Sequence, residues 1–208
     1  MFRNFTQVVD YAKKLETKDL IVANPEDTNI IVAINDAFQM GLIRPVLVGD
    51  KKKILDMLME LGISKQGYEI YNAVDPKDAA LMSVKLVSKH ENAILMKGLL
   101  HTKILLNEVL DKDHGLFTGA FLSHIGVLEI PNYHKLLVVS DVAVIPQPDL
   151  DQKIALTNYV INVARALGIE KPKVALIAAS EQVLPKMQAC VDAAIISKMA
   201  DRGQIKNA

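Results

Sequence analysis

The residues best suited to chemistry lie where apolar runs, expected to be buried strands, give way to polar loops. In one such loop, Lys97 and Gly98 follow the apolar run 93–96, and Thr102 opens a helical pattern. A positive charge, a flexible backbone and the free N–H groups of a helix start are the components of an anion or phosphate cradle. The loop has neither of the common glycine-rich phosphate-binding spacings, so an ordinary turn before a capped helix remains an alternative. The candidate binding residues of this loop are Lys97, Gly98, His101 and Thr102.

A second group of polar residues lies in and after the stretch 118–124. Ser123 and His124 adjoin, and Ser140 and Asp141 lie one predicted strand later, which suggests a Ser/His/Asp hydrolase. Successive residues of a strand point to opposite faces, so we do not expect the Ser123 hydroxyl to bond the His124 ring. The sequence also lacks the G-x-S-x-G elbow of many hydrolases. We therefore interpret Ser123 and Asp141 as polar groups on the wall of a cleft.

Neither metal nor thiol chemistry is indicated. The five histidines include no H-x-x-x-H pair and have no carboxylate partner at ligand spacing, so no metal site is predicted. Cys190 is the only cysteine, which excludes an intramolecular disulfide and a cage of thiolate ligands. We interpret Cys190 as a passive small residue.

The composition limits the partners that the chain is expected to have. Lys+Arg and Asp+Glu both number 24, so no net charge attracts a nucleic acid. Hydrophobic residues make up 50% of the chain and charged residues 23%, which is a globular balance. No apolar segment approaches the ~20 residues that span a bilayer, and the first residues lack the apolar run of a signal peptide. We expect a cytoplasmic protein with no nucleic-acid or membrane partner.

Helical and strand patterns alternate along the first half of the chain. Short apolar runs that end at Asn24, Gly49 or Gly98 are typical of buried parallel strands, and amphipathic helical spacing follows them. The predicted strands are 20–23, 45–49, 68–71 and 93–96. The predicted helices are 6–15, 27–40, 51–61, 76–90 and 101–110.

The later part of the chain has a different pattern. Runs 123–130 and 135–145 are separated only by residues 131–134, which are too few for a crossover helix, so we expect antiparallel neighbours. The remaining predicted elements are a helix over 150–167, a strand over 174–178 and a helix over 191–200.

Together these elements predict an α/β fold with a mostly parallel sheet and flanking helices. The sequence contains no Ser/Gly-rich linker, so any domain boundary joins closely packed parts. We place it near Pro131, which gives an N-terminal α/β lobe over 1–131 and the start of a second α/β lobe over 132–208.

Long motifs in three parts of the chain carry a family resemblance. They are Met-Lys-Gly-Leu-Leu-His-Thr at 96–102, Thr-Gly-Ala-Phe-Leu-Ser-His-Ile-Gly-Val-Leu-Glu-Ile-Pro-Asn-Tyr at 118–133 with its continuation at 139–143 and 148–150, and the stretch 185–206. In these motifs the chain resembles the phosphate butyryltransferase branch of the phosphate acyltransferase family. The resemblance implies transfer of a butyryl or similar short acyl group between coenzyme A and phosphate, with coenzyme A as a substrate and no tightly bound cofactor. It also implies a homodimer and a two-lobed fold like that of the isocitrate and isopropylmalate dehydrogenases.

The resemblance gives roles to particular residues. The transfer requires phosphate held against a thioester carbonyl, donors for the oxyanion and a thiolate that leaves. Lys97 is then expected to neutralise phosphate, and the helix start at Thr102 to supply N–H donors. Asp141 is the local candidate for a proton acceptor, and Ser123 is the other catalytic candidate. Further substrate-binding candidates are Thr118, Gly119 and Ser140.

Two departures from the family pattern shape the expectation. In the acetyl branch, the helix after the Gly-x-x-His-Thr turn (98–102 here) carries an arginine for the anionic substrate. The nearest position in this sequence is Asn107, which favours the butyryl branch. Family members also continue into a closing segment that carries a catalytic arginine and aspartate in the acetyl branch, and the present sequence stops before it. We therefore expect a C-terminally truncated member of the family.

Our leading hypothesis is acyl transfer through a ternary complex, without a covalent acyl-enzyme, because the sequence indicates no activated nucleophile. One alternative is a non-catalytic fragment that binds coenzyme A or phosphate, and another is an enzyme of the phosphate acetyltransferase type. A nucleotide-dependent dehydrogenase of the related two-lobed fold is disfavoured by the lack of a dinucleotide fingerprint.

Overall fold

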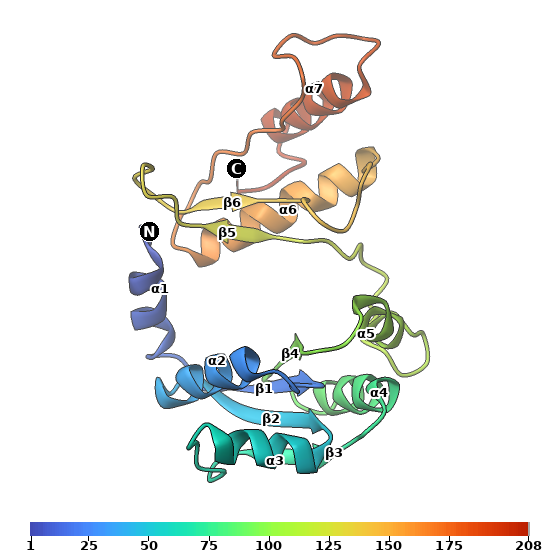
Figure 1. The fold of residues 1–208 in the computed structure, drawn as a ribbon. Coiled ribbons are helices and arrows are strands. Elements are labelled where there is room, and N and C mark those ends of the chain that lie inside the picture. The colour runs from blue at the N-terminus through green and yellow to red at the C-terminus, as the bar shows by residue number, and fades with distance from the viewer. Residues whose placement is uncertain (208) are drawn as a thin grey trace. The chain divides into compact units, whose positions relative to one another are not determined.

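The computed structural model describes residues 1–207 and divides into two units (Figure 1). The first, which we call the sheet unit, is Tyr11–Gly119. The second, which we call the hairpin unit, combines Met1–Asp10 with the residues from Ala120 onward. Among the helices of residues 1–207, none has the length and apolar character needed to cross a bilayer.

The sheet unit is built on four parallel strands in the order β3-β2-β1-β4. The strands are β1 (Lys18–Ala23), β2 (Ile43–Gly49), β3 (Glu69–Asn72) and β4 (Ala93–Lys97). In the sheet register, Val22 of β1 lies opposite Leu47 of β2 and Met96 of β4. The α/β fold and the parallel pairing of the predicted strands are thus confirmed.

Three of the four helices of this unit begin at an aspartate whose side chain caps the first turn. The helices of this unit are α2 (Thr28–Gln39), α3 (Lys51–Glu60), α4 (Pro76–Val87) and α5 (Thr102–Val109). The side chains of Asp27, Asp50 and Asp75 accept hydrogen bonds from first-turn N–H groups of α2, α3 and α4. These bonds satisfy backbone donors that a helix start leaves without an intrahelical partner.

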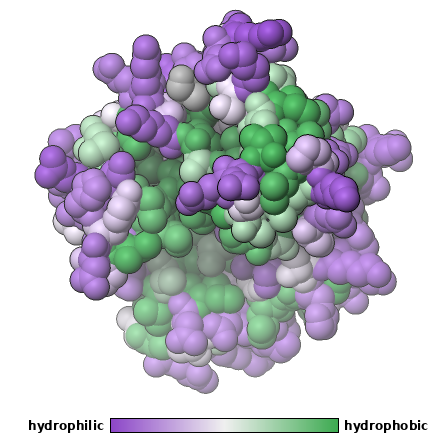
Figure 2. Space-filling model, turned by 90° about the horizontal axis from the view of Figure 1, so that it is seen from above, coloured by the Kyte–Doolittle hydropathy of each residue, from purple (hydrophilic) through white to green (hydrophobic). Residues whose placement is uncertain are grey.

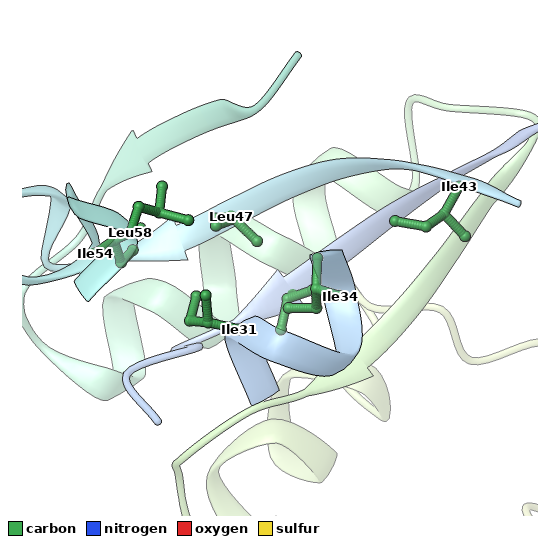
Figure 3. Close-up of a cluster of buried hydrophobic side chains, with 7 residues drawn as sticks. Ile31, Ile34, Ile43, Leu47, Ile54 and Leu58 are labelled. Carbon is green, nitrogen blue, oxygen red and sulfur yellow. The ribbon is translucent and has the colours of Figure 1, made fainter. Parts of the chain in front are cut away.

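Helices cover both faces of the sheet, which explains why β1 and β2 are almost continuously apolar. Figure 3 shows the cluster on one face, where α2 and α3 meet the strands through Ile31, Ile34, Ile43, Leu47, Ile54 and Leu58. On the other face, Ile21 and Val48 pack with Ala79 of α4. A neighbouring cluster joins Ala23 to Val84 of α4 and Leu105 of α5. These clusters hold the ends of β1 and β4 next to the start of α5.

The hairpin unit contains two short strands and two helices. Its strands β5 (Gly126–Leu128) and β6 (Leu137–Val139) pair antiparallel, with Val127 opposite Val138, so the predicted antiparallel pairing is confirmed. Helix α1 (Phe5–Ala12) begins in this unit, and α6 (Leu150–Ala166) and α7 (Gln188–Asp201) form its helical part. The small core of α6 and α7 is centred on Ile161, Ile196 and Ile205.

A buried ion pair also joins α6 to α7. Lys153 Nζ lies 2.5 Å from Asp192 Oδ2, and the Asp192 side chain is 1% exposed. Some large apolar side chains of the hairpin unit are exposed to solvent: Ile177 is 88% exposed and Val142 66%. Figure 2 likewise shows hydrophobic residues at the molecular surface between hydrophilic ones.

The strand predicted over 174–178 does not form. The side chains alternate as in a strand, with Val174 and Leu176 packed against the α6–α7 core and Ile177 exposed. Within residues 1–207, however, no backbone hydrogen bond joins this segment to a neighbouring strand. A strand is defined by its ladder partner, and side-chain alternation alone does not show whether a partner exists.

The predicted hairpin strands 123–130 and 135–145 are also longer than β5 and β6. The second strand ends early because Asp141 accepts hydrogen bonds from Ala143 N and Val144 N at 2.7 and 2.9 Å, which turns the backbone. The division into the two units falls between Gly119 and Ala120, and β5 and β6 lie on either side of Pro131 and pair with each other. The lobes 1–131 and 132–208 stay a prediction.

Candidate functional site

The strand order identifies one edge of the parallel sheet as the place for a ligand. From β1 the chain proceeds to β2 and β3 on one side, and β4 then pairs on the other side of β1. In open α/β sheets, ligands bind beyond the carboxyl ends of the strands at such a reversal of direction. Here the reversal lies between the ends of β1 and β4, flanked by the loops 24–27 and 98–101.

The loop after β4 passes directly against the end of β1. Gly98 N–H donates to Ala23 O at 2.8 Å, and Leu99 N–H donates to Asn24 O at 2.6 Å. A Cβ atom on Gly98 would lie 2.3 Å from Asn24 O and 2.6 Å from Ala23 O. Both atoms belong to the backbone, so only glycine fits here and the predicted importance of Gly98 has a steric basis.

Lys97 is held over this loop by carbonyl groups. Its Nζ donates to Gly98 O at 3.1 Å and to Leu100 O at 3.2 Å. An ammonium group has three N–H donors, so one remains for a bound anion. The lysine charge is therefore fixed at the carboxyl edge of the sheet, and no carboxylate of residues 1–207 pairs with it.

A cavity of about 360 Å³ opens beside Lys97. Its lining consists of Pro76, Lys97, Leu99, Leu100, His101 and Ile104. The cavity combines one positive charge and one imidazole with apolar walls. Such a mixture suits an anion attached to, or reacting with, an apolar group.

The start of α5 adds further donors to this edge. His101 is the N-cap residue, yet its side chain makes no capping hydrogen bond, in contrast to the aspartates that cap α2, α3 and α4. Ile104 N–H donates to His101 O at 2.9 Å, so within residues 1–207 the first-turn donors that remain are the N–H groups of Thr102 and Lys103. They lie at the positive end of the helix dipole. The structure therefore brings Lys97, Gly98, His101 and Thr102 together, as the sequence predicts. Thr118 and Gly119 belong to the same unit but do not line this cavity.

The remaining predicted residues gather in the hairpin unit. Ser123 Oγ donates to Asp141 Oδ2 at 3.0 Å and lies 3.3 Å from Ser140 Oγ. Ser140 Oγ donates to the backbone oxygen of His124 at 2.7 Å. The antiparallel pairing of β5 and β6 thus brings Ser123, Ser140 and Asp141 into one hydrogen-bonded group. The His124 ring takes no part in it, and its buried Nδ1 has no hydrogen-bond partner.

Asp141 is surrounded by donors. Burial raises the pKa of Asp141, but hydrogen bonds from the N–H groups of Val144, Ala143 and His124 and from the Ser123 hydroxyl outweigh burial. The result is a pKa held well below the usual aspartate value. A carboxylate with a low pKa is a weak proton acceptor, and its oxygens are already engaged. These bonds favour Asp141 as the organiser of the turn after β6, while a catalytic role stays a prediction.

Asn24 belongs to a loop at the carboxyl edge where the sequence places a ligand, but sequence reasoning gave it no role of its own. Asn24 is 5% exposed and has a positive φ of 55°. Its side-chain Nδ2 donates to Leu99 O at 2.6 Å. The available signal was the Asn-Pro pair after an apolar run, since asparagine tolerates the left-handed conformation.

Within residues 1–207, no cluster of three His, Cys, Asp or Glu side chains is arranged to hold a metal ion.

Comparison with known proteins gives consistent results. Residues 74–208 match the family described as "Phosphate acetyl/butaryl transferase". The chain is 41% identical over 206 residues to the phosphate butyryltransferase of Clostridium acetobutylicum, an alignment that covers 99% of this chain and 68% of that protein. It is 38% identical over 189 residues to the phosphate acetyltransferase of Thermotoga maritima, covering 91% of this chain and 64% of that protein.

Solved structures share the fold. A branched-chain phosphotransacylase from Enterococcus faecalis superposes with a TM-score of 0.76 at 24% identity, covering 90% of this chain and 66% of that one. A phosphotransacetylase from Streptococcus pyogenes gives a TM-score of 0.77 at 15% identity, covering 96% of this chain and 70% of that one. The chain thus spans about two thirds of the length of these relatives.

Proposed function

This chain belongs to the phosphate acetyl/butyryl transferase family, and we propose that it transfers a butyryl or similar short acyl group between coenzyme A and inorganic phosphate. The observation that supports the proposal best is the Lys97 cavity at the reversal point of the parallel sheet. It offers a fixed ammonium group beside apolar walls, and α5 begins directly after His101 of its lining. Those features suit phosphate together with a short acyl group.

The proposed reaction joins a phosphate oxygen to the thioester carbonyl carbon of the acyl-CoA. The carbon–sulfur bond breaks, the proton of the phosphate passes to the departing thiolate, and the products are acyl phosphate and free coenzyme A. Rate acceleration then depends on holding the two substrates in line and on donors for the oxyanion. No oxidant, reductant or metal ion is needed to balance this step.

The residues of the sheet unit are assigned to phosphate. The Lys97 ammonium compensates its charge, and the N–H groups that begin at Thr102 bind its oxygens. Gly98 allows the loop to approach β1, and His101 lines the cavity beside the lysine. Thr118 and Gly119 are further substrate-binding candidates by family resemblance.

The hairpin unit is assigned Ser123, Ser140 and Asp141. The Ser123 hydroxyl donates to a carboxylate that is a weak base, so Ser123 lacks the activation of a covalent nucleophile. This supports transfer through a ternary complex without an acyl-enzyme. Detection of a butyryl group on Ser123 or Cys190 by mass spectrometry would contradict that part of the proposal.

The finer features of the proposal come from the family resemblance. They are a butyryl preference, favoured by Asn107 where the acetyl branch has an arginine, a homodimer, a cytoplasmic location and no tightly bound cofactor. The two-lobed architecture of the isocitrate and isopropylmalate dehydrogenases belongs to the same set. Rates with acetyl-CoA and butyryl-CoA, measured side by side, separate the butyryl type from the acetyl type.

The test is release of free thiol from butyryl-CoA by the 208-residue chain, with and without inorganic phosphate. We expect release only when both substrates are present. A second candidate function, a non-catalytic module that binds coenzyme A, is favoured by the weak basicity of Asp141, whose oxygens already accept hydrogen bonds. Calorimetric binding of coenzyme A without thiol release would establish that alternative, and absence of both would overturn the proposal.

A further inference from the structure

We propose that Asn24 is the positioning residue of the β4–α5 loop and that it sets the phosphate affinity of the Lys97 cavity without touching the ligand. The inference rests on the proposed function for the phosphate part alone. The positioning role itself can be tested without substrate, because hydrogen exchange reports how well the β4–α5 loop is ordered.

Asn24 has two features that are unfavourable by themselves. It is one of only two non-glycine residues with positive φ within residues 1–207, the other being Asn207. Its side-chain Oδ1 is buried and has no hydrogen-bond partner in the part of the chain that the structure describes. Backbone strain and unpaired buried polar atoms persist where the surrounding structure imposes them, and they gather at functional sites.

In this conformation Asn24 makes two hydrogen bonds to Leu99. Asn24 O accepts a hydrogen bond from Leu99 N at 2.6 Å, and Asn24 Nδ2 donates to Leu99 O, also at 2.6 Å. Asn24 N–H in turn donates to Val48 O of β2 at 2.7 Å. Asn24 thereby fastens the loop after β4 to the central part of the sheet, next to the bond from Gly98 N–H to Ala23 O.

The fastened peptide groups are the ones that hold the lysine. Leu99 lies between Gly98 and Leu100, whose carbonyl oxygens accept hydrogen bonds from Lys97 Nζ at 3.1 and 3.2 Å. Leu99, Leu100 and Lys97 all line the cavity. A displacement of Leu99 therefore moves both the cavity wall and the acceptors that orient the ammonium group.

Direct contact between Asn24 and a ligand is excluded by burial. Asn24 is 5% exposed, its Nδ2 is engaged by Leu99 O, and its Oδ1 is inaccessible to solvent. Its influence on phosphate must pass through the loop. That makes Asn24 a positioning residue and not a catalytic one.

Three variants separate the side chain from the backbone. Asn24→Gly permits the left-handed conformation and the backbone bonds but removes the bond to Leu99 O. Asn24→Asp keeps the shape and replaces the donor by an ionisable oxygen. Asn207→Gly is the matched control, because it is the same substitution at the other left-handed asparagine, which is exposed and remote in sequence.

The first measurement is hydrogen exchange of the Gly98 and Leu99 amides without substrate. We expect exchange about fivefold to tenfold faster in Asn24→Gly, as the loss of one hydrogen bond implies, and unchanged in Asn207→Gly. Equal exchange in wild type and Asn24→Gly would overturn the positioning role. This result does not depend on whether the chain is an acyltransferase.

The second measurement is kinetic. We expect the apparent KM for phosphate to rise about fivefold to tenfold in Asn24→Gly, with the KM for butyryl-CoA changed less than about twofold. In Asn24→Asp the defect relative to wild type should shrink as the pH falls. Burial raises the pKa of a carboxyl group, and the protonated form can donate to Leu99 O.

The outcomes distinguish the two proposals. Absence of turnover in wild type, together with faster loop exchange in Asn24→Gly, removes the proposed function and leaves the positioning role standing. Turnover in wild type with unchanged phosphate KM in Asn24→Gly removes the phosphate part of the inference. A parallel rise in both KM values, with no pH-dependent recovery in Asn24→Asp, would show a merely structural role.

Discussion

The two groups of polar residues differ in how their hydrogen bonds are used. Around the Lys97 cavity, the lysine keeps one N–H donor and α5 begins without a side-chain cap. In the hairpin unit, Ser123, Ser140 and Asp141 bond to one another and to nearby backbone groups. Unused donors are what a ligand needs, whereas a saturated network mainly defines local structure.

The scaffolds of the two groups differ as well. The sheet unit has a four-stranded sheet with apolar clusters on both faces. The hairpin unit has a two-stranded sheet, a small apolar core and a buried ion pair between α6 and α7. The sheet unit is therefore stabilised chiefly by apolar burial, and the hairpin unit depends more on polar contacts.

The largest expected effect is on that ion pair. Lys153→Met preserves the apolar stem but leaves Asp192, 1% exposed, without its cation; Gln188 Nε2 remains as a donor at 2.7 Å. The hydrogen bond from Lys153 holds the pKa of Asp192 below its usual value. We expect the free energy of unfolding of the hairpin unit, measured by urea denaturation, to fall by about 3 kcal/mol.

The matched control for this prediction is Lys198→Met on the same helix as Asp192. Lys198 pairs with Asp201 at 3.0 Å, and the two side chains are 63% and 62% exposed. An exposed pair of this kind contributes less than about 1 kcal/mol. Equal losses in the two variants would contradict the dependence of the hairpin unit on its buried pair.

The next effect concerns the close approach of the β4–α5 loop to β1. In Gly98→Ala, the new methyl group meets Asn24 O at 2.3 Å and Ala23 O at 2.6 Å, so the loop must move. We expect a loss of about 2 kcal/mol in unfolding free energy and a loss of phosphate binding in calorimetric titration. Gly126→Ala is the control, since its methyl group meets the Val139 side chain at 3.3 Å and should cost about 1 kcal/mol or less. If Gly98→Ala kept its phosphate affinity, phosphate binding would not depend on the close approach of this loop to β1.

A smaller effect depends on pH and probes the saturated network. Because Asp141 has a lowered folded-state pKa, its contribution to stability is present above the unfolded value of 3.8 and is lost as the pH falls below it. Asp141→Asn should flatten that part of the pH profile of the urea midpoint. Its amide NH₂ group also has to face N–H donors, so the variant should be less stable at pH 7. An unchanged acid limb in Asp141→Asn would mean that another carboxylate controls it.

Local sequence signals account for most of the sheet unit. Apolar runs that stop at Asn24, Gly49 and Gly98 mark three strand ends. Asp27 and Asp50, which follow the first two, mark the starts of α2 and α3. The proximity of Ser123 and Asp141 also followed from the short connection between their strands. These features depend on neighbours in sequence, which is why the pattern shows them.

What could not be predicted depends on distant parts of the chain. Asn24 and Leu99, which are joined by a hydrogen bond, are separated by 75 positions. The Asn-Pro pair is compatible with the positive φ of Asn24 but does not show which distant residue its side chain contacts. The segment 174–178 has the alternation of a strand, but its pairing depends on residues elsewhere. Two of the donors that lower the pKa of Asp141, Val144 N–H and Ala143 N–H, likewise come from a turn that the hydrophobic pattern does not specify.

The smallest effect on stability, and the sharpest test of the comparison, is expected for Lys97→Met. The lysine bonds only to carbonyl oxygens of its own loop, so its replacement should change the unfolding free energy by less than about 0.5 kcal/mol. Phosphate affinity, measured by calorimetry, should nevertheless fall about tenfold or more, because hydrogen bonds to charged groups are the stronger ones. Lys103→Met is the control, since Lys103 is an exposed lysine of α5 that does not line the cavity. Equal phosphate affinity in the two variants would mean that the anion binds away from the sheet edge. The free donors of the Lys97 cavity would then not distinguish it from the Ser123, Ser140 and Asp141 group as a ligand site.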